Sequence, residues 1–170
     1  MEKKVKTIGV LTSGGDAPGM NAFVRSVVRT ALHYGIKVKG IRQGYLGLIN
    51  SEFIDMNLRS VSGILEEGGT MLGSARCLEF KEDAGVERAK GNCISAGIDG
   101  LIVCGGDGSF RGARDLSLKG IPCIGVPGTI DNDISASEYS IGFDTAVNTV
   151  VQNIDKLRDT SESHNRCSVV

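Results

Sequence analysis

The chain has 170 residues, of which 41% are hydrophobic, 23% are charged and 24 are glycine. This length is sufficient for one domain with its own core, and the composition is typical of a globular, loop-rich protein rather than a disordered one. The net charge of −1 gives no electrostatic basis for binding nucleic acid or an anionic membrane surface. The apolar runs fall far short of a membrane-spanning helix, and no signal-peptide core follows the N-terminus, so we expect a cytoplasmic protein.

The pattern of the N-terminal segment predicts two strands around one helix. Residues 5–11 form a buried apolar strand. The helix follows from apolar residues at helical spacing. Pro18 is expected in its first turn, where proline needs no backbone donor, and Gly35 is placed to cap its end. Residues 36–41 form the second strand, and residues 44–58 are expected to be irregular.

The remaining elements alternate between helices and strands. In chain order they are a short helix at 59–67, a loop at 70–80, a helix at 82–96, a strand at 100–104, a helix at 109–118, a strand at 121–126 and a helix at 143–158. The last helix has one apolar stripe, which is formed by Val147, Val150, Val151, Ile154 and Leu157. Residues 168–170 resemble the beginning of another strand, which makes the chain look incomplete.

Strands that alternate with helices favour right-handed βαβ units. We therefore predict an α/β fold of three layers, incomplete in this chain, in which a mostly parallel sheet has helices on both faces. In such sheets, ligands bind at the carboxyl ends of the strands. The segments IGVLTSGGD and LIVCGGD both run from a strand into Gly-Gly-Asp, so two strand ends are expected to present similar turns.

The five cysteines show neither a CxxC pair nor a zinc-type spacing. Their odd number argues against a secreted disulfide framework. Cys104 and Cys123 lie in strand-like runs, where a buried free thiol is the usual finding, and Cys93 and Cys167 are also expected to be structural. Cys77 differs from these four, because it lies on a loop beside an arginine.

Two glycine-rich turns follow apolar strands. Gly14-Gly15 and the segment 105–108 let backbone N–H groups approach phosphate oxygens, and the dipole of the following helix adds partial positive charge. Tight turns also use glycine for its positive φ, so a glycine pair alone is weakly specific. Asp107 strengthens the prediction, since an acidic residue fits among phosphates when a divalent metal bridges the two. The alternative is that Asp107 is a helix N-cap.

A second polar loop follows the strand at 121–126 and contains Thr129, Asp131, Asn132 and Asp133. Two carboxylates two residues apart can take different roles, one at a metal and the other as a proton acceptor. A loop rich in Asp and Asn can also be an ordinary turn. Because this loop accompanies the first one, the pair predicts phosphoryl transfer. The chain has neither a P-loop ending nor the protein-kinase motifs.

Arg76 lies on a loop of small residues. A guanidinium in that position suits the charge that develops on a transferring phosphoryl group, and a solvated surface arginine is the alternative.

Six segments of the chain are similar to the amino-terminal half of bacterial ATP-dependent 6-phosphofructokinases: IGVLTSGGDAPGMN, GGTMLGSARC, CGGDGS, PGTIDNDI, IGFDTA and IDKLRDTSESHNR. They follow the family's order and spacing from about residue 5 onward. The resemblance implies a two-domain α/β enzyme of glycolysis, usually a homotetramer, that transfers a phosphoryl group from MgATP to the 1-hydroxyl of fructose 6-phosphate. Residues 1–141 would then be the ATP-binding domain and residues 142–170 the start of a truncated substrate-binding domain.

The resemblance also implies roles for the residues at matching positions. It assigns the nucleotide to Gly15, Tyr45, Arg76, Cys77, Gly106, Asp107, Gly108, Ser109 and Gly112. It assigns magnesium to Asp107 and Asp133. It assigns the sugar to Thr129, Ile130, Asp131 and Arg166, with Arg166 reaching the sugar phosphate of a neighbouring subunit. Asp131 would be the general base, assisted in catalysis by Arg76 and Thr129. An allosteric site for ADP or phosphoenolpyruvate would contain Arg25, Arg29 and Arg158.

Two glycines distinguish related groups of enzymes. Pyrophosphate-dependent relatives typically carry Asp where Gly108 stands and Lys where Gly128 stands, so the glycines favour ATP. NAD kinases share a Gly-Gly-Asp-Gly loop but lack PGTIDND.

The chain also departs from the family pattern. Leu58 stands where some relatives have a basic effector-site residue, and the family's later MGRHAG-type motif is absent from this sequence. We therefore expect the 170 residues to be inactive alone. The alternative is a non-catalytic nucleotide-binding or dimerising module.

Overall fold

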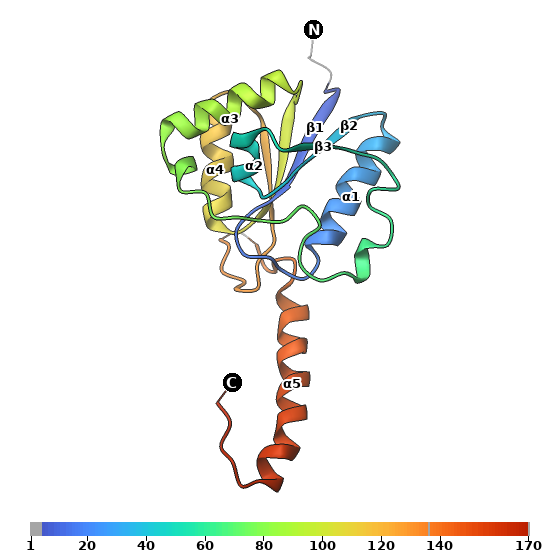
Figure 1. The fold of residues 1–170 in the computed structure, drawn as a ribbon, viewed down its shortest axis with the longest axis vertical. Helices are drawn as coiled ribbons and strands as arrows, with labels where there is room; N and C mark the ends of the chain where they lie inside the picture. Colours follow the sequence, from blue (N-terminus) through green and yellow to red (C-terminus); the bar gives the residue numbers. More distant parts are fainter. Residues whose placement is uncertain (1–4, 136, 170) are drawn as a thin grey trace.

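The computed structural model describes residues 5–135 and 137–169. The five strands of this part form one sheet in the order β3-β2-β1-β4-β5 (Figure 1). The strands are β1 Thr7–Thr12, β2 Lys37–Ile41, β3 Phe53–Met56, β4 Gly100–Gly105 and β5 Cys123–Pro127. The helices are α1 Met20–His33, α2 Tyr45–Asn50, α3 Asp83–Ser95, α4 Asp107–Leu118 and α5 Phe143–Ser163, with the 3-10 turns η1 Ile64–Glu66 and η2 Glu79–Lys81.

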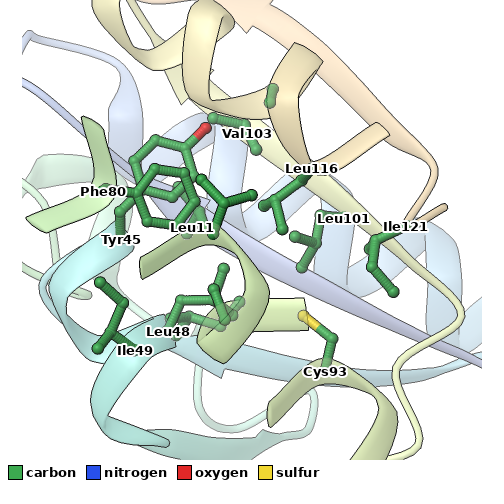
Figure 2. Close-up of a cluster of buried hydrophobic side chains, with 14 of the residues drawn as sticks. Leu11, Tyr45, Leu48, Ile49, Phe80, Cys93, Leu101, Val103, Leu116 and Ile121 are labelled. Carbon is green, nitrogen blue, oxygen red and sulfur yellow. The ribbon is translucent and has the colours of Figure 1, made fainter. Parts of the chain in front are cut away.

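Parallel pairing dominates the sheet, as predicted. β1 pairs in parallel with β2 and β4, β4 pairs in parallel with β5, and the edge strand β3 is antiparallel to β2. Helix α1 covers one face, and α2, α3 and α4 cover the other (Figure 1). Alternate residues of β1 supply both layers, since Val10 packs with Val24 of α1 and Leu11 packs with Leu48 and Leu116 of the opposite layer (Figure 2). The predicted three-layer α/β fold is confirmed.

The start of α1 differs from the prediction. Pro18 does not lie in the first turn of the helix, because a turn closed by the Met20 N–H and the Ala17 carbonyl at 3.2 Å places it before the helix. Gly19 holds the N-cap position with a φ of 88°, which is the left-handed region that favours glycine. At the other end Gly35 follows the helix with a φ of 71°, and the predicted glycine cap is confirmed.

The segment 44–58 is not irregular, and that prediction is wrong. It contains α2 and β3, which return the chain to the edge of the sheet. The Arg42 N–H donates to the Glu52 carbonyl at 3.1 Å, and the Glu52 N–H donates to the Gly47 carbonyl at 2.8 Å. Helix α2 has only six residues, too few for hydrophobic periodicity to distinguish it. It is stabilised by tertiary packing, because Leu48 and Ile49 are buried in the core.

The prediction of a helix at 59–67 is also wrong, since only the 3-10 turn η1 forms in this segment. The Asn57 side-chain carbonyl accepts hydrogen bonds from the N–H groups of Arg59 and Ser60, which favours a turn over a helix. Gly63 then adopts a φ of 79°. The other predicted elements match the observed ones to within a few residues, and α5 continues to Ser163. Residues 168 and 169 form no strand, and Val170 lies outside the described residues.

Gly47 lies where α2 closes against the strand before it. An added Cβ would overlap the carbonyl oxygen of Arg42, so backbone rather than a flexible side chain would have to move. We expect Gly47→Ala to lower the free energy of unfolding by about 2–3 kcal/mol in urea denaturation. Gly91→Ala is the control, because this exposed site in α3 has no atom within 4 Å of an added Cβ. It should gain about 0.5–1 kcal/mol, and equal stabilities of the two variants would contradict the close contact between Gly47 and the Arg42 carbonyl.

The thiols differ in their accessibility. Cys93 and Cys104 are fully buried, and burial raises the pKa of each to about 12. Cys123 is half-buried rather than buried, whereas Cys167 is exposed. Because the thiolate is the reactive form, we expect iodoacetamide at about pH 8 to alkylate Cys167 first and Cys104 only after unfolding. Peptide mass spectrometry measures this order, and early labelling of Cys104 would contradict its buried position.

Helix α5 extends away from the sheet (Figure 1). It has no buried residue, and its apolar stripe of Val147, Val150, Val151, Ile154 and Leu157 is 43% to 51% exposed. The predicted helix is confirmed, but its stripe is not part of the core. Among the described residues, no helix has the length and apolar character needed to cross a membrane.

Candidate active site

A cleft of about 1040 Å³ lies at the carboxyl ends of β1, β4 and β5. It is lined by residues of the turns after these strands, at 13–16, 106–109 and 128–131, and by residues of the loop at 75–81. These loops gather at the end of the sheet from which α5 extends (Figure 1). Parallel strands bring their carboxyl ends to one edge, so the cleft lies where the sequence predicts a ligand site.

The first turn of α4 presents backbone to this cleft. Gly106 occupies the N-cap position with a φ of −101°, and the helix begins at Asp107. The first N–H groups of a helix have no partner inside it and readily bind anions. A Cβ added to Gly108 would have no heavy atom within 4 Å, so the backbone is open at this position. The turn has the form of a phosphate-binding cradle.

Asp107 is the first residue of α4, so the alternative that it is the N-cap is wrong. Its side chain is 64% exposed and lies 3.5 Å from the Arg111 guanidinium one helical turn later. Gly106 and Gly108 line the cleft on either side of Asp107, whose own side chain does not. The carboxylate therefore borders the cradle and is accessible to a solvated metal ion.

The loop after β5 contributes Thr129, Ile130 and Asp131 to the cleft. The Asp131 N–H donates to the Thr129 hydroxyl oxygen at 3.2 Å, and that hydroxyl donates to the Asp131 carboxylate at 3.4 Å. Asn132 has a φ of 50°, and its side chain bonds the Ser140 N–H and the Glu138 carbonyl. Asn132 therefore has the turn-forming role that sequence left open, while Asp131 remains exposed in the cleft. Asp133 is exposed but does not line it.

The two polar loops are joined to each other. The Gly128 N–H donates to the Gly105 carbonyl at 3.0 Å, which continues the pairing of β4 with β5. A Cβ on Gly106 would lie 4.0 Å from the Cβ of Thr129. The phosphate-type turn and the Asp131 loop therefore border the same cleft, as transfer between two bound molecules requires.

Tyr45 and Phe80 form an aromatic wall beside the cradle. Their rings stack with centroids 4.1 Å apart (Figure 2). The Tyr45 hydroxyl donates to the Ser109 carbonyl at 2.6 Å. Burial raises the pKa of Tyr45 above its ordinary value. A Cβ on Gly112 would lie 2.9 Å from the Tyr45 ring, so glycine at this position lets α4 pack closely. Tyr45 thus supports α4 as well as lining the cleft. Phe80 also lines the cleft, although the sequence analysis did not predict it as a site residue.

Basic side chains line the same cleft. Arg76 and Cys77 come from the predicted loop, and Lys81, Arg111 and Arg114 join them. Within residues 5–135 and 137–169, Arg76 forms neither a hydrogen bond nor an ion pair. The last three residues were missed because a single basic residue on a predicted helix or loop gives no signal of its own. Arg114 is paired with Asp115 at 2.8 Å and Arg111 with Asp107 at 3.5 Å, so among the described residues Arg76 and Lys81 are the basic side chains of the cleft that remain available to an anionic ligand.

Four predicted arginines lie outside the cleft. Arg158 is exposed on α5, and Arg166 is exposed beyond its end. On α1, the Arg25 guanidinium donates to the Val61 carbonyl, and Arg29 borders a separate cavity of about 240 Å³ together with Leu58. The structure does not bring these four residues together with the cleft.

Of the two predicted magnesium ligands, Asp107 fits the chemistry of that ion, whereas Asp133 does not line the cleft. The described residues contain no cluster of three acidic, histidine or cysteine side chains that could hold a metal. Magnesium usually takes one or two carboxylates together with water and substrate phosphates, so it does not need such a cluster. Asp107 beside the cradle meets this requirement.

A family model described as "PFK: Phosphofructokinase" matches residues 7–170. The chain belongs to the phosphofructokinase family. It is 58% identical over 166 residues to the ATP-dependent 6-phosphofructokinase of Lysinibacillus sphaericus, and 59% identical to that of Clostridium botulinum strain Hall. Each alignment covers 98% of this chain and 52% of the relative, so the chain spans about half the length of the curated relatives it matches.

Solved phosphofructokinase structures share the fold. The enzyme from Saccharomyces cerevisiae has a TM-score of 0.85 and 40% identity, over 94% of this chain and 25% of that chain. A pyrophosphate-dependent phosphofructokinase from Marinobacter aquaeolei has a TM-score of 0.71 and 28% identity, over 82% of this chain and 37% of that chain. The resemblance found from the sequence motifs is confirmed.

Proposed function

We propose that this chain forms the ATP-binding half of an ATP-dependent 6-phosphofructokinase, which transfers the γ-phosphoryl group of MgATP to the 1-hydroxyl of fructose 6-phosphate. One observation supports this most directly. The Gly128–Gly105 hydrogen bond joins the glycine cradle of α4 to the loop of Thr129 and Asp131, so both border one cleft. The identity to enzymes with this name, 58% and 59%, supports the same conclusion.

Each part of the cleft has a role in this reaction. The backbone of the first turn of α4 binds phosphate oxygens, and Arg76 neutralises charge on the transferring group. Asp131 accepts the proton of the sugar hydroxyl, and Thr129 holds its carboxylate through the 3.4 Å hydrogen bond. Asp107, with Asp133 further along the second loop, would hold magnesium, which supplies positive charge to the phosphates when bound.

The two glycines that favour ATP differ in their surroundings. Gly108 has open space around an added Cβ, so a carboxylate there would project freely into the cradle. At Gly128 an added Cβ would overlap the Cys104 sulfur, so a lysine does not fit this backbone. The close packing at Gly128 excludes the lysine of the pyrophosphate-dependent relatives, and at Gly108 the absence of a side chain leaves the cradle free, so the two glycines support ATP rather than pyrophosphate as the phosphoryl donor.

We further propose the assembly and regulation that the family resemblance implies. The parent enzyme would be a cytoplasmic homotetramer in which Arg166 reaches the sugar phosphate of a neighbouring subunit. Arg25, Arg29 and Arg158 would bind ADP or phosphoenolpyruvate as effectors. Residues 1–141 would be the ATP-binding domain and residues 142–170 the start of the substrate domain, a division supported by Gly142, whose φ of 106° marks the start of α5.

Calorimetric titration of the 170-residue chain with MgATP tests the proposal. We expect saturable binding, and no turnover when fructose 6-phosphate is added in a coupled assay. Absence of nucleotide binding by the folded chain would contradict the proposed site.

A second candidate is a nucleotide-binding module that dimerises and has no catalytic role. The exposed apolar stripe on α5 favours it, because such a stripe is typical of a helix that packs against another element. Sedimentation of the chain, with Ile154→Asp as a comparison, tests the module. A monomeric chain would contradict a dimerising module, whereas a dimer that Ile154→Asp dissociates is expected both of the module and of one half of a homotetrameric enzyme, so only the monomer decides between the two candidates.

A further inference from the structure

The loop that brings Arg76 to the cleft has little structure of its own. Residues 67–78 contain no helix or strand, and Gly69 and Gly73 have φ values of 68° and 70°. Two of its backbone hydrogen bonds are the Gly73 N–H to the Thr70 carbonyl at 3.0 Å, and the Gln43 N–H to the Leu72 carbonyl at 2.9 Å. A glycine-rich segment has high conformational entropy, so its position must be set by other parts of the chain.

Asn21 binds this loop from the first turn of α1. Its side-chain Nδ2 donates to the Glu67 carbonyl at 3.0 Å, and its Oδ1 accepts the Met71 N–H at 2.7 Å. The residue is 3% exposed, so the alternative to these bonds is a buried amide without partners. Both hydrogen-bonding ends of one rigid side chain therefore fix two points of the loop.

Thr12 binds the same loop from the end of β1 and is fully buried. Its hydroxyl donates to the Gly73 carbonyl at 3.2 Å and lies 2.8 Å from the Thr70 hydroxyl. A threonine hydroxyl has one proton, so Thr70 donates to Thr12 in this pair. The bonds from Thr12 and Asn21 thus hold residues 67, 70, 71 and 73, and the last of these lies three positions before Arg76.

We infer that Thr12, Asn21 and Thr70 form a buried latch that positions the Arg76 loop over the phosphate cradle, and that Thr12 and Asn21 are positioning residues of the site. Arg76 itself bonds to no other residue of the described ranges, so its place depends on the backbone of its loop. The latch fixes this backbone together with one further contact, the hydrogen bond from the Ser74 hydroxyl to the Gly14 carbonyl at 2.7 Å. Leu72, which is 2% exposed, packs in the core between the latched positions and reinforces the same placement. The relevance of this placement to nucleotide binding rests on the proposed function. The hydrogen bonds of the latch do not depend on that proposal.

The test compares Thr12→Val and Asn21→Ala with two controls in the 170-residue chain. Thr12→Ser keeps the hydroxyl. Asn92→Ala removes two comparable hydrogen bonds, to the carbonyls of Leu48 and Ile49, on the opposite side of the sheet. Hydrogen exchange of residues 67–78 is the first measurement, and MgATP affinity by calorimetry is the second.

We expect Thr12→Val and Asn21→Ala to speed exchange of this segment roughly tenfold or more, with Thr12→Ser close to the wild type. Asn92→Ala should leave the segment protected even if it destabilises the whole chain to the same extent. MgATP affinity should fall roughly tenfold in the two latch variants only, because the loop is no longer pre-organised. If either variant fails to fold, Thr70→Val removes the half-buried partner alone and should loosen the same segment.

Equal exchange of residues 67–78 in Thr12→Val and Asn92→Ala would overturn the latch, and so would loosening by Thr12→Ser to the level of Thr12→Val. A wild-type chain that binds no MgATP would instead overturn the proposed function, while the exchange measurement still decides the latch.

Discussion

Gly108→Asp is expected to weaken MgATP binding by about 100-fold or more while leaving the fold intact. The added Cβ would meet no atom within 4 Å, so the carboxylate enters the cradle without displacing the protein. Two negative charges about 4 Å apart near a protein surface repel by about 4 kcal/mol, and each 1.4 kcal/mol corresponds to about tenfold in affinity. An acidic residue in the first turn of a helix is favourable to the helix itself, so the free energy of unfolding should stay within about 0.5 kcal/mol of the wild type.

Gly108→Asn is the matched control, because it has the size of aspartate without the charge. Calorimetry of both variants with MgATP, and urea denaturation of each, separate charge repulsion from steric exclusion. We expect Gly108→Asn to retain most of the affinity. Wild-type affinity of Gly108→Asp would contradict the placement of the phosphates at α4, and equal losses in the two variants would show that size rather than charge is responsible.

The elements that the sequence predicted correctly share a strong local pattern. The helix after Gly19 places Met20, Phe23, Val24 and Val28 on one buried face, so its periodicity is unambiguous. The strands β1 and β4 are short apolar runs that lead into a Gly-Gly-Asp segment, and they are neighbours in the sheet. Because the carboxyl ends of these strands meet, the prediction of two similar turns at one edge was sufficient to locate the cleft.

The missed elements are those that tertiary contacts create. Helix α2 has six residues, and β3 has four and lies at the edge of the sheet, so both are too short for hydrophobic periodicity to distinguish them. The turn at Asn57 depends on side-chain hydrogen bonds that compete with helix formation. Hydrophobic patterning cannot predict these elements, because α2 and β3 depend on packing against distant residues and the Asn57 turn depends on side-chain hydrogen bonds.

The candidate site likewise contains residues that a local sequence motif predicts and residues that only tertiary contacts bring to it. The residues of the two glycine and aspartate loops are contiguous in sequence, and most of them line the cleft together. Phe80 and Lys81 enter the cleft from a 3-10 turn and Arg114 enters it from α4, at positions that no motif marks. Tyr45 was assigned to the nucleotide, yet its hydroxyl is already bonded to the Ser109 carbonyl, a supporting role that only the packed structure reveals.

Asp131→Ser is expected to reduce the turnover of an assembled enzyme by roughly 10²–10⁴-fold, the usual contribution of a general base. Asp131 lines the cleft on the loop that Gly128 joins to the cradle, so its carboxylate is placed to receive a proton from an acceptor alcohol. Serine keeps a small polar side chain but cannot hold that proton at neutral pH. The experiment uses a chimera in which this chain replaces the matched half of the Lysinibacillus sphaericus relative, which is 58% identical to it.

The design of this chimera makes the outcome specific to the proposed role. Asp144→Ser, on the exposed first turn of α5, removes a carboxylate of the same kind outside the cleft and should leave turnover unchanged. The Michaelis constants of Asp131→Ser for both substrates should stay within about tenfold of the parent chimera, because loss of a proton acceptor acts on the transition state rather than on binding. A chimera that keeps its full rate without Asp131 would remove this residue from the mechanism. Equal losses in Asp131→Ser and Asp144→Ser would instead indicate a general effect of lost negative charge, since only a base in the cleft distinguishes the two positions.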